Sequence, residues 1–456
     1  MSQLKITFVG GAGQVTGSSF LLESPFGEKI LVDCGLNQGG KIFEEENEKA
    51  FPFKPSELMA VFVTHAHLDH VGRIPKLVKD GFKGRIISTA PTRDIAELSL
   101  LDSMGVMEKE ARRYGHHQLL YSADDVAASM RLWETAPYGK GKNNVGEFAW
   151  ELLDAGHILG SAMVVLYVGS KKIVFSGDLG NSPAPILKDT DPIEGTDVLI
   201  VESTYGDRNH EDREQREAIL EDVIEETVSG GGVLLIPAFS IERTQELLFE
   251  MNSMIEKGRI PRVPIFLDSP LAISVTEVYK KYESFFNEDA KALIRSGDDI
   301  FKFPGLTMTK TTDESKKINE TQGSKIIMAG SGMSNGGRIL HHEKRYLSDP
   351  KNTLFLIGYQ AAGSLGRQLL DGAKVVNILG DNVSVAARVV SLSGYSAHKD
   401  SDHLLDFVKG AEETLEMVYC IHGEPKSSFA LVQKIRDYLG IKAEAPAKND
   451  VVTIEL

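Results

Sequence analysis

Residues 65–70 read His-Ala-His-Leu-Asp-His, and four of these six side chains are strong metal ligands. Crowding imidazoles and carboxylates together is unfavourable unless a cation binds among them, and this mixture suits zinc best. The apolar run before the cluster predicts a buried strand over 58–64, so the cluster lies at the carboxyl end of that strand, where α/β sheets bind ligands. Alternation should turn His65 and His67 to the same side, while Asp69 and His70 fall on the turn that follows. The sequence therefore predicts two divalent metal ions close together.

Two further residues could complete such a site. His157 lies in a loop between predicted strands at 147–153 and 161–168, and Asp178 directly follows a predicted strand at 171–176. Taken alone, a loop histidine is most often a surface residue, and Gly-Asp after a strand is most often a turn. Together they supply what the first cluster lacks, namely a third ligand for one ion and a carboxylate that bridges both.

The chain resembles the metallo-β-lactamase superfamily, and within it the β-CASP subgroup of nucleases. The resemblance extends over nearly the whole chain and depends on motifs that occur in the family's order and spacing. The matching positions are Asp33, the cluster at 65–70, His157, Asp178, Glu202, His398 and His422.

The resemblance implies an α/β (α+β) fold: an αββα metallo-β-lactamase sandwich with an inserted β-CASP cap domain built on a mainly parallel sheet. We expect residues 1–207 to form the first part of the sandwich, 208–385 the insert, and 386–456 the rest of the sandwich. The sequence pattern agrees, because strands and helices alternate from about residue 208 and a short strand is predicted at 386–391. In the family the substrate enters between the sandwich and the cap.

The resemblance also assigns the metal ligands. It implies that His65, His67 and His157 hold one zinc ion, and that Asp69, His70 and His422 hold the other. Asp178 bridges the two ions.

Three more residues receive roles from the resemblance. Asp33 is expected to hold the loop of the first cluster without touching a metal. His398 is the candidate general acid for the leaving ribose 3′-oxygen, and Glu202 is expected to orient it and raise its pKa.

Two glycine-rich loops in the insert, 329–338 and 358–367, each join a predicted strand to a helix. A loop that opens a helix presents free N–H groups, which suits phosphate, although glycine-rich turns without a ligand are equally common. Phe239 is predicted either to stack a base or to lie in the core, and His341 and His342 are predicted on a helix surface. The candidate RNA phosphate-binding residues are Ser331, Gly332, Ser334, Gly336, Gly337, Arg338, Ser364 and Arg367.

Composition sets broad limits on the 456-residue chain. Its 42% hydrophobic and 25% charged residues are ordinary for a globular protein, and the two cysteines, Cys34 and Cys420, are expected to be buried. No signal peptide or membrane-length apolar run is evident, so a cytoplasmic protein without a membrane partner is expected. A net charge of −15 argues against nonspecific coating of nucleic acid, but bound metal ions would add local positive charge.

The function implied is that of a zinc-dependent endoribonuclease with two zinc ions per chain. A hydroxide shared by the ions would attack single-stranded RNA and leave 5′-phosphate and 3′-hydroxyl ends, with 5′-3′ exonucleolytic cleavage left open. RNA is favoured over DNA because the DNA-repair branch of the family typically lacks a histidine at the position of His422. Family members often dimerise, so a homodimer is compatible with the sequence.

Two alternatives remain at this stage. A hydrolase of small esters or thioesters has the same fold, but Glu202, His398 and the large insert argue against it. A non-catalytic RNA-processing scaffold would have lost metal ligands, and none is substituted here.

Overall fold

The chain folds into two compact units. The structure, a computed structural model, describes residues 2–38, 41–114, 119–139, 141–210, 213–358, 360, 363–392 and 394–456. Unit 1 comprises residues 1–209 and 398–456, and unit 2 comprises residues 210–397. Unit 2 is therefore inserted into unit 1.

Unit 1 contains, within the described residues, two seven-stranded sheets. The first sheet has the order β22 (Val451–Glu455), β1 (Gln3–Gly10), β2 (Ser19–Glu23), β3 (Lys29–Val32), β4 (Leu58–Phe62), β5 (Arg85–Ser88) and β6 (Trp133–Thr135). The second has the order β21 (Ala443–Glu444), β20 (Met417–Ile421), β11 (Val198–Glu202), β10 (Lys171–Phe175), β9 (Ala162–Val168), β8 (Phe148–Asp154) and β7 (Asn143–Val145).

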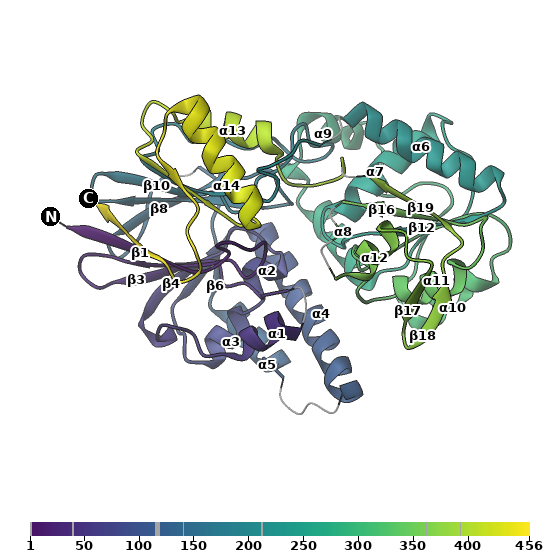
Figure 1. The fold of residues 1–456 in the computed structure, drawn as a ribbon, viewed down its shortest axis with the longest axis horizontal. Coiled ribbons are helices and arrows are strands. Elements are labelled where there is room, and N and C mark those ends of the chain that lie inside the picture. The colour runs from purple at the N-terminus through teal and green to yellow at the C-terminus, as the bar shows by residue number, and fades with distance from the viewer. Residues whose placement is uncertain are drawn as a thin grey trace. The chain divides into compact units, whose positions relative to one another are not determined.

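The two sheets pack face to face around one hydrophobic core. Alternate residues of β8 are buried, as expected for a strand with one face toward the core. Aromatic pairs join the sheets: the rings of Phe62 and Trp150 lie 5.3 Å apart, and those of Phe20 and Phe175 lie 5.7 Å apart. This arrangement confirms the predicted sandwich (Figure 1).

Helices cover the outer faces of the sandwich, as Figure 1 shows. Leu404 of α13 and Leu431 of α14 pack with residues of the second sheet in a separate apolar cluster. The helices of unit 1 are α1 (Lys41–Glu48), α2 (Leu68–Val71), α3 (Ile74–Lys79), α4 (Ala90–Tyr114), α5 (Ala123–Arg131), α13 (Ser401–Lys409) and α14 (Pro425–Lys434).

The C-terminal segment of the chain is built into both sheets. β22 pairs antiparallel with β1, and β20 pairs parallel with β11, with Ile421 opposite Glu202. β11 also pairs parallel with β10, so these three strands end at the same edge. This register brings His422, which follows β20, beside segments that lie far away in the sequence.

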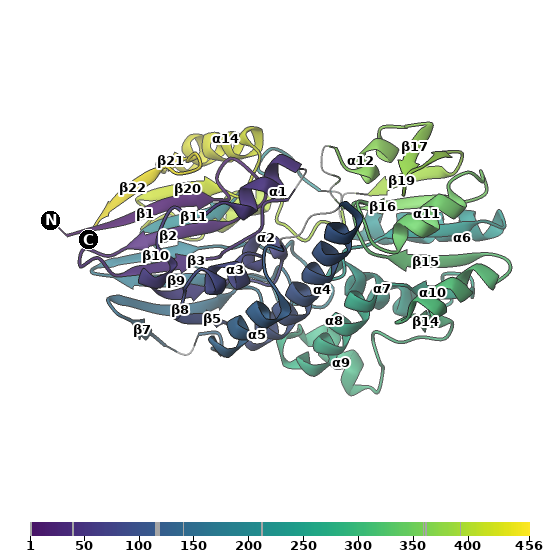
Figure 2. The same cartoon turned by 90° about the horizontal axis from the view of Figure 1, so that it is seen from below.

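Unit 2 is built on a six-stranded sheet in which every strand pairing within the described residues is parallel. This confirms the mainly parallel sheet predicted for the insert (Figure 2). Its order is β14 (Leu306–Met308), β13 (Ile265–Leu267), β15 (Lys325–Ala329), β12 (Val233–Pro237), β16 (Thr353–Ile357) and β19 (Arg388–Leu392). A separate hairpin consists of β17 (Val375–Ile378) and β18 (Asp381–Ser384). The helices are α6 (Arg213–Ser229), α7 (Arg243–Glu256), α8 (Pro270–Lys281), α9 (Glu288–Arg295), α10 (Thr312–Lys317), α11 (Ile339–Tyr346) and α12 (Leu365–Leu370).

The structure differs from the sequence prediction in several local details. The predicted boundaries follow residues 207 and 385, whereas the compact units divide after residues 209 and 397. The second boundary lies later than predicted because β19 pairs with β16 and so belongs to the sheet of unit 2. Asp69 and His70 lie on the short helix α2 and not on a turn.

The polar stretch 296–322 also departs from its expected loop. It contains β14 and the helix α10, which begins with a capping box between Thr311 and Glu314. The hydroxyl of Thr311 accepts from the amide of Glu314, and the Glu314 side chain accepts from the amide of Thr311. A Thr-x-x-Glu signature is readable from sequence, so this helix start could have been predicted.

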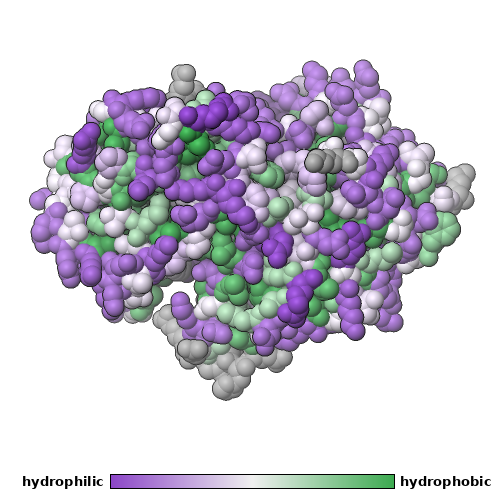
Figure 3. Space-filling view, turned by 180° about the vertical axis from the view of Figure 1, so that it is seen from behind, coloured by the Kyte–Doolittle hydropathy of each residue, from purple (hydrophilic) through white to green (hydrophobic). Residues whose placement is uncertain are grey.

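Hydrophilic residues cover much of one face of the molecule (Figure 3). On the face drawn in Figure 3, hydrophilic residues extend over both units, and hydrophobic residues form smaller areas among the hydrophilic ones. Among the described residues, no helix combines the length and apolar character needed to cross a membrane. Both cysteines are buried, as predicted.

Candidate metal centre

The candidate ligands follow the carboxyl ends of several strands of unit 1. His65 and His67 lie between β4 and α2, and His157 lies in the loop between β8 and β9. Asp178 follows β10, and His422 follows β20. The parallel pairing of β10, β11 and β20 therefore gathers side chains from opposite ends of the chain.

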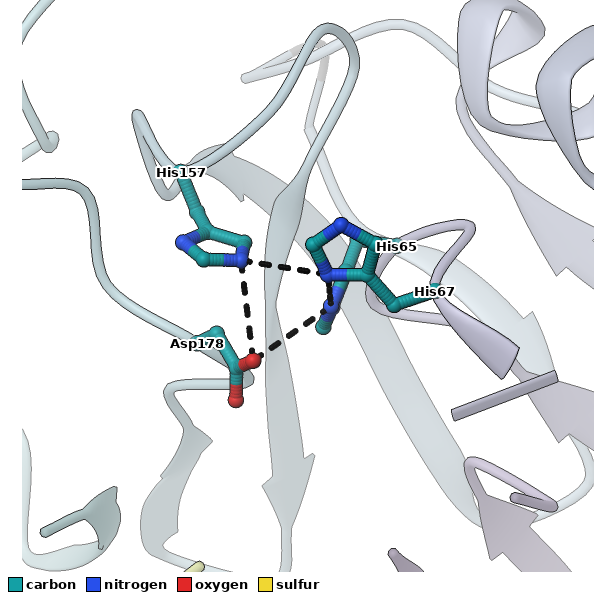
Figure 4. Close-up of side chains that lie close together, drawn as sticks. All are labelled: His65, His67, His157 and Asp178. Atoms are coloured by element: carbon teal, nitrogen blue, oxygen red, sulfur yellow. Dashed lines mark hydrogen bonds and ion pairs between the residues drawn. The ribbon is translucent and has the colours of Figure 1, made fainter. Parts of the chain in front are cut away.

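The first group consists of His65, His67, His157 and Asp178, whose ligand atoms all lie within 4.8 Å of one another (Figure 4). His67 Nδ1 lies 3.1 Å from His65 Nε2 and 3.3 Å from His157 Nε2. Oδ2 of Asp178 lies 3.5 Å from His65 Nε2 and 3.6 Å from His157 Nε2. Three imidazoles and one carboxylate oxygen thus surround a single point.

The second group consists of Asp69, His70 and His422. Asp69 Oδ2 lies 3.9 Å from His70 Nε2 and 3.7 Å from His422 Nε2. Oδ1 of Asp178 faces the same two nitrogens, at 3.4 Å from His70 and 3.6 Å from His422. Asp178 therefore directs one carboxylate oxygen to each group.

Buried polar atoms without partners show that these groups fit metal ions. His70 Nε2 and Asp178 Oδ1 are fully buried and make no hydrogen bond within the described residues. Leaving such atoms unpaired is costly unless a ligand binds them. Imidazole nitrogens together with carboxylate oxygens form a donor set that suits zinc.

Electrostatics favours the same fit. Burial lowers the pKa of His65 well below its usual value and that of His67 to about 4, so both imidazoles are neutral and offer a lone pair. Burial opposes ionisation of Asp178, but the neighbouring His422 and His70 hold its pKa well below the usual range. Burial opposes protonation of His70, but Asp178 and Asp33 raise its pKa well above the usual value, so without a metal ion a proton on His70 balances the Asp178 carboxylate, and a cation would replace that proton.

Asp33 lies behind the ligands. Its Oδ2 lies 2.7 Å from His70 Nδ1, and its Oδ1 accepts a 2.8 Å hydrogen bond from the Thr64 amide. The hydroxyl of Thr64 donates to Asp33 Oδ2 at 2.8 Å and lies 3.1 Å from His65 Nδ1. The outer nitrogens of two candidate ligands therefore connect to one buried carboxylate, which orients their Nε2 atoms toward Asp178.

His398 and Glu202 lie at the edge of the first group. His398 Nδ1 lies 3.0 Å from Glu202 Oε1 and 4.0 Å from Asp178 Oδ2. Glu202 is fully buried, and its Oε1 also accepts a 2.7 Å hydrogen bond from the amide of Leu179. Burial lowers the pKa of His398, but the Glu202 carboxylate raises it more, to about 9. His398 therefore carries a proton at neutral pH.

The polar side chains of the first glycine-rich loop of unit 2 bind inside the unit. The guanidinium of Arg338 pairs with the buried Asp268 at 2.6 Å and donates to two backbone carbonyls. Ser334 is buried and donates to Glu343, and Ser331 Oγ accepts from the amides of residues 335 and 336. The predicted residues Gly332, Gly336 and Gly337 lie in the same loop.

The second loop shows similar internal contacts. Ser364 caps α12 by accepting from the amide of Arg367, whose side chain pairs with Asp371, the residue that follows this helix. Residues 359, 361 and 362 of this motif lie outside the described residues.

Two other predictions for unit 2 are resolved by burial. The surface position expected for His342 is wrong, because this residue is 3% exposed and its Nε2 lies 2.8 Å from Asp268. Phe239 is 38% exposed, and its ring lies against Gly332, where an added Cβ would come within 2.6 Å of it. Phe239 is therefore not a core residue.

Sequence reasoning missed two residues that contact the ligands. Thr64 directly precedes His65, and this adjacency could have indicated that its side chain contacts a ligand. Ser18 contacts His422 across 404 positions of sequence, and no local pattern indicates that contact.

Comparison with known families assigns most of the chain. The metallo-beta-lactamase superfamily matches residues 12–218, and the Beta-Casp domain matches residues 244–369. A family described as a Zn-dependent metallo-hydrolase RNA specificity domain matches residues 382–446.

Individual relatives match over nearly the whole chain. Ribonuclease TTHA0252 of Thermus thermophilus is 38% identical over 94% of this chain and 95% of its own length. Transcription termination factor FttA of Methanosarcina mazei is 31% identical over 99% of this chain and 72% of its own length. An RNase J-like protein of Methanocaldococcus jannaschii is 33% identical over 98% of this chain and 99% of its own length.

A solved structure supports the fold alone. A protein of unknown function from Enterococcus faecalis matches 99% of this chain and all of its own, with a TM-score of 0.53 and 14% identity. Taken with the family matches and the relatives, these findings show that the chain belongs to the metallo-β-lactamase superfamily and, within it, to the β-CASP subgroup.

Proposed function

We propose that this protein is a zinc-dependent ribonuclease that hydrolyses phosphodiester bonds of single-stranded RNA. The observation that carries the proposal is the orientation of Asp178, whose two carboxylate oxygens each face a separate group of histidines. A carboxylate shared in this way is what a pair of neighbouring ions requires. The names of the relatives in Thermus thermophilus and Methanocaldococcus jannaschii support RNA as the substrate.

His65, His67 and His157 would hold one zinc ion, Asp69, His70 and His422 the other, and Asp178 both. When bound, such a pair supplies Lewis acidity and a nucleophile derived from water at neutral pH. The chain's own residues fix the geometry: Asp33 and Thr64 hold the outer nitrogens of His70 and His65.

His398 would act as the general acid. The leaving ribose 3′-oxygen is a poor leaving group, so its departure is faster when a side chain protonates it. Glu202 keeps the proton on His398, because its carboxylate raises the pKa of this imidazole to about 9. Donation of that proton to the 3′-oxygen leaves a 3′-hydroxyl on one fragment and a 5′-phosphate on the other.

Unit 2 would contribute recognition of the RNA strand. The partly exposed ring of Phe239 offers a face on which a base can stack. Arg367 is exposed at its side chain and can exchange its contact with Asp371 for an RNA phosphate. Arg338 is paired with Asp268 and would stabilise the loop instead of binding RNA.

Labelled RNA tests the proposal directly. Purified protein with measured zinc content is incubated with single-stranded RNA labelled at the 5′ or the 3′ end, with and without a chelator. We expect chelator-sensitive cleavage that leaves 5′-phosphates, and the fragment ladders distinguish internal from terminal cleavage. Single-stranded DNA tests sugar selectivity, and a thioester substrate tests the alternative hydrolase. Turnover of the thioester without cleavage of RNA would overturn the proposal.

A further inference from the structure

Ser18 connects segments that lie at opposite ends of the sequence. This residue precedes β2, is fully buried, and has its Oγ 2.8 Å from Nδ1 of His422. Its amide donates to the carbonyl of Asp69 at 2.9 Å, and its carbonyl accepts from the amide of Gly35 at 3.0 Å. One residue therefore contacts two of the three candidate ligands of the second group, Asp69 and His422.

We propose that Ser18 is a positioning residue that selects which nitrogen of His422 faces the second ion. The inference rests on the proposed function only in taking Asp69, His70 and His422 as ligands. It extends that proposal because it gives Ser18 the role of orienting a ligand through His422.

The physical reason is the choice of tautomer. A neutral imidazole that offers a lone pair from Nε2 carries its proton on Nδ1. Nδ1–H then donates to Ser18 Oγ, which leaves the Nε2 lone pair directed toward Asp69 and Asp178. Without the hydroxyl, Nδ1–H of a buried ring has no acceptor, and the opposite tautomer becomes competitive.

The backbone of His422 is fixed independently of Ser18. Its amide donates to the carbonyl of Gly11 at 2.6 Å, and its own carbonyl accepts a 3.0 Å hydrogen bond from Thr204 Oγ1. A Cβ on Gly11 would lie 2.8 Å from Ser18 Oγ, so glycine leaves room for the hydroxyl. Ser18 therefore controls the orientation of the ring and not the path of the chain at His422.

The next residue supplies a matched control. Ser19 is also buried, at 6% exposure, but its Oγ has no hydrogen-bond partner among the described residues. Ser18→Ala and Ser19→Ala thus remove the same atoms from adjacent buried positions, and only the first removes a contact to a candidate ligand.

Zinc binding, measured by competition with a chromogenic chelator, tests the inference without reference to RNA cleavage. In Ser18→Ala, we expect the affinity for one of the two ions to fall by about 10- to 100-fold while the other ion stays bound. Ser19→Ala should bind both ions as the parent does. In a His422→Ala background, Ser18→Ala should have no further effect, because the contact is already lost.

Each result has a clear meaning. Equal zinc affinities for Ser18→Ala and Ser19→Ala, or equal loss of both ions in Ser18→Ala, would overturn the inference. Nitrogen-15 spectra of the zinc-loaded parent give a second measurement that needs no variant: a proton on His422 Nδ1 is expected, and metal bound at Nδ1 would contradict it. A parent that binds two zinc ions but does not cleave RNA would refute the proposed substrate and leave the zinc test of Ser18 intact.

Discussion

The sheet edges of the two units use their polar side chains in opposite ways. In unit 1, His70 Nε2 on α2 and Asp178 Oδ1 after β10 lie 3.4 Å apart, and neither atom makes a hydrogen bond within the described residues. In unit 2, Arg338 and Ser334 of a strand-end loop are bound to the buried carboxyls of Asp268 and Glu343. The first edge is organised for a ligand, whereas the second is largely satisfied by its own residues.

This difference shows what residue type and spacing can establish. A single buried imidazole can pair with a carboxylate, as His342 does with Asp268. The crowded imidazoles of the metal centre instead leave His70 Nε2 and Asp178 Oδ1 without a hydrogen bond among the described residues, which indicates an ion. Serine, glycine and arginine in a strand–loop–helix turn can form hydrogen bonds within the protein or bind a phosphate. The same loop pattern therefore occurs with or without a phosphate ligand. The predictions that follow test the contrast between the two edges.

The largest expected effect comes from removing the shared carboxylate. Asp178→Ala should reduce RNA cleavage by about 10³-fold or more, because the several kcal/mol of transition-state stabilisation supplied by the ions is lost. Elemental analysis should show that both ions bind more weakly. Retention of two tightly bound ions by this variant would contradict a bridging role.

His398→Ala should slow cleavage by about 10²- to 10⁴-fold while both ions stay bound, since a general acid acts on the leaving group and not on the metal. His403→Ala is the matched control, because this exposed histidine on α13 contacts Asp400 and not Glu202. Single-turnover rates and zinc content are measured on both variants. Loss of an ion in His398→Ala would make His398 a ligand.

Unit 2 should show a pH-dependent stability that originates at Glu343. Burial raises the pKa of this carboxyl from 4.5 to about 8, with the Ser334 hydroxyl opposing the rise. The folded state therefore binds the proton more tightly than the unfolded state, and stability should fall by up to about 1.4 kcal/mol per pH unit between pH 4.5 and about 8. Glu343→Gln should remove this dependence of stability on pH, and this variant should be more stable than the parent near pH 8. Denaturant unfolding across that range measures both, and parallel pH profiles would refute the assignment.

The smallest effects separate the two arginines of the strand-end loops. Arg338→Ala should destabilise the protein by about 1–3 kcal/mol, because the buried Asp268 loses a charged partner. Arg367→Ala should change stability by less than about 1 kcal/mol, because its pair with Asp371 is exposed. If Arg367 contacts phosphate, the salt dependence of RNA binding should decrease by about one unit of slope in that variant only. An equal change of slope in both variants would show that Arg338 leaves Asp268 to bind RNA.

Much of the fold was predictable because the metal-ligand motifs directly follow segments whose apolar pattern predicts strands. The strand before His65 and the parallel sheet of unit 2 followed from the pattern along the chain. His157 and Asp178 were predicted as ligands that the first cluster lacks, and His422 was predicted from the resemblance to the family. The strand β19 was assigned to the wrong unit because pairing with β16 depends on the tertiary fold and not on local sequence.

Contacts between distant residues were the main limit. His342 has the sequence pattern of a helix-surface residue, yet it is buried in contact with Asp268, which lies 74 positions away in the sequence. The contact between Ser18 and His422 likewise depends on the pairing of the C-terminal strands with both sheets. Such pairings depend on the assembled fold, which local periodicity does not encode.

A crystal of the zinc-loaded protein, with anomalous diffraction recorded at the zinc edge, tests the central claim most directly. Two peaks are predicted at about 2.0–2.2 Å from their ligand atoms, one among His65, His67 and His157 and the other among Asp69, His70 and His422. One oxygen of Asp178 should contact each ion. A single peak, or peaks away from these side chains, would contradict the account.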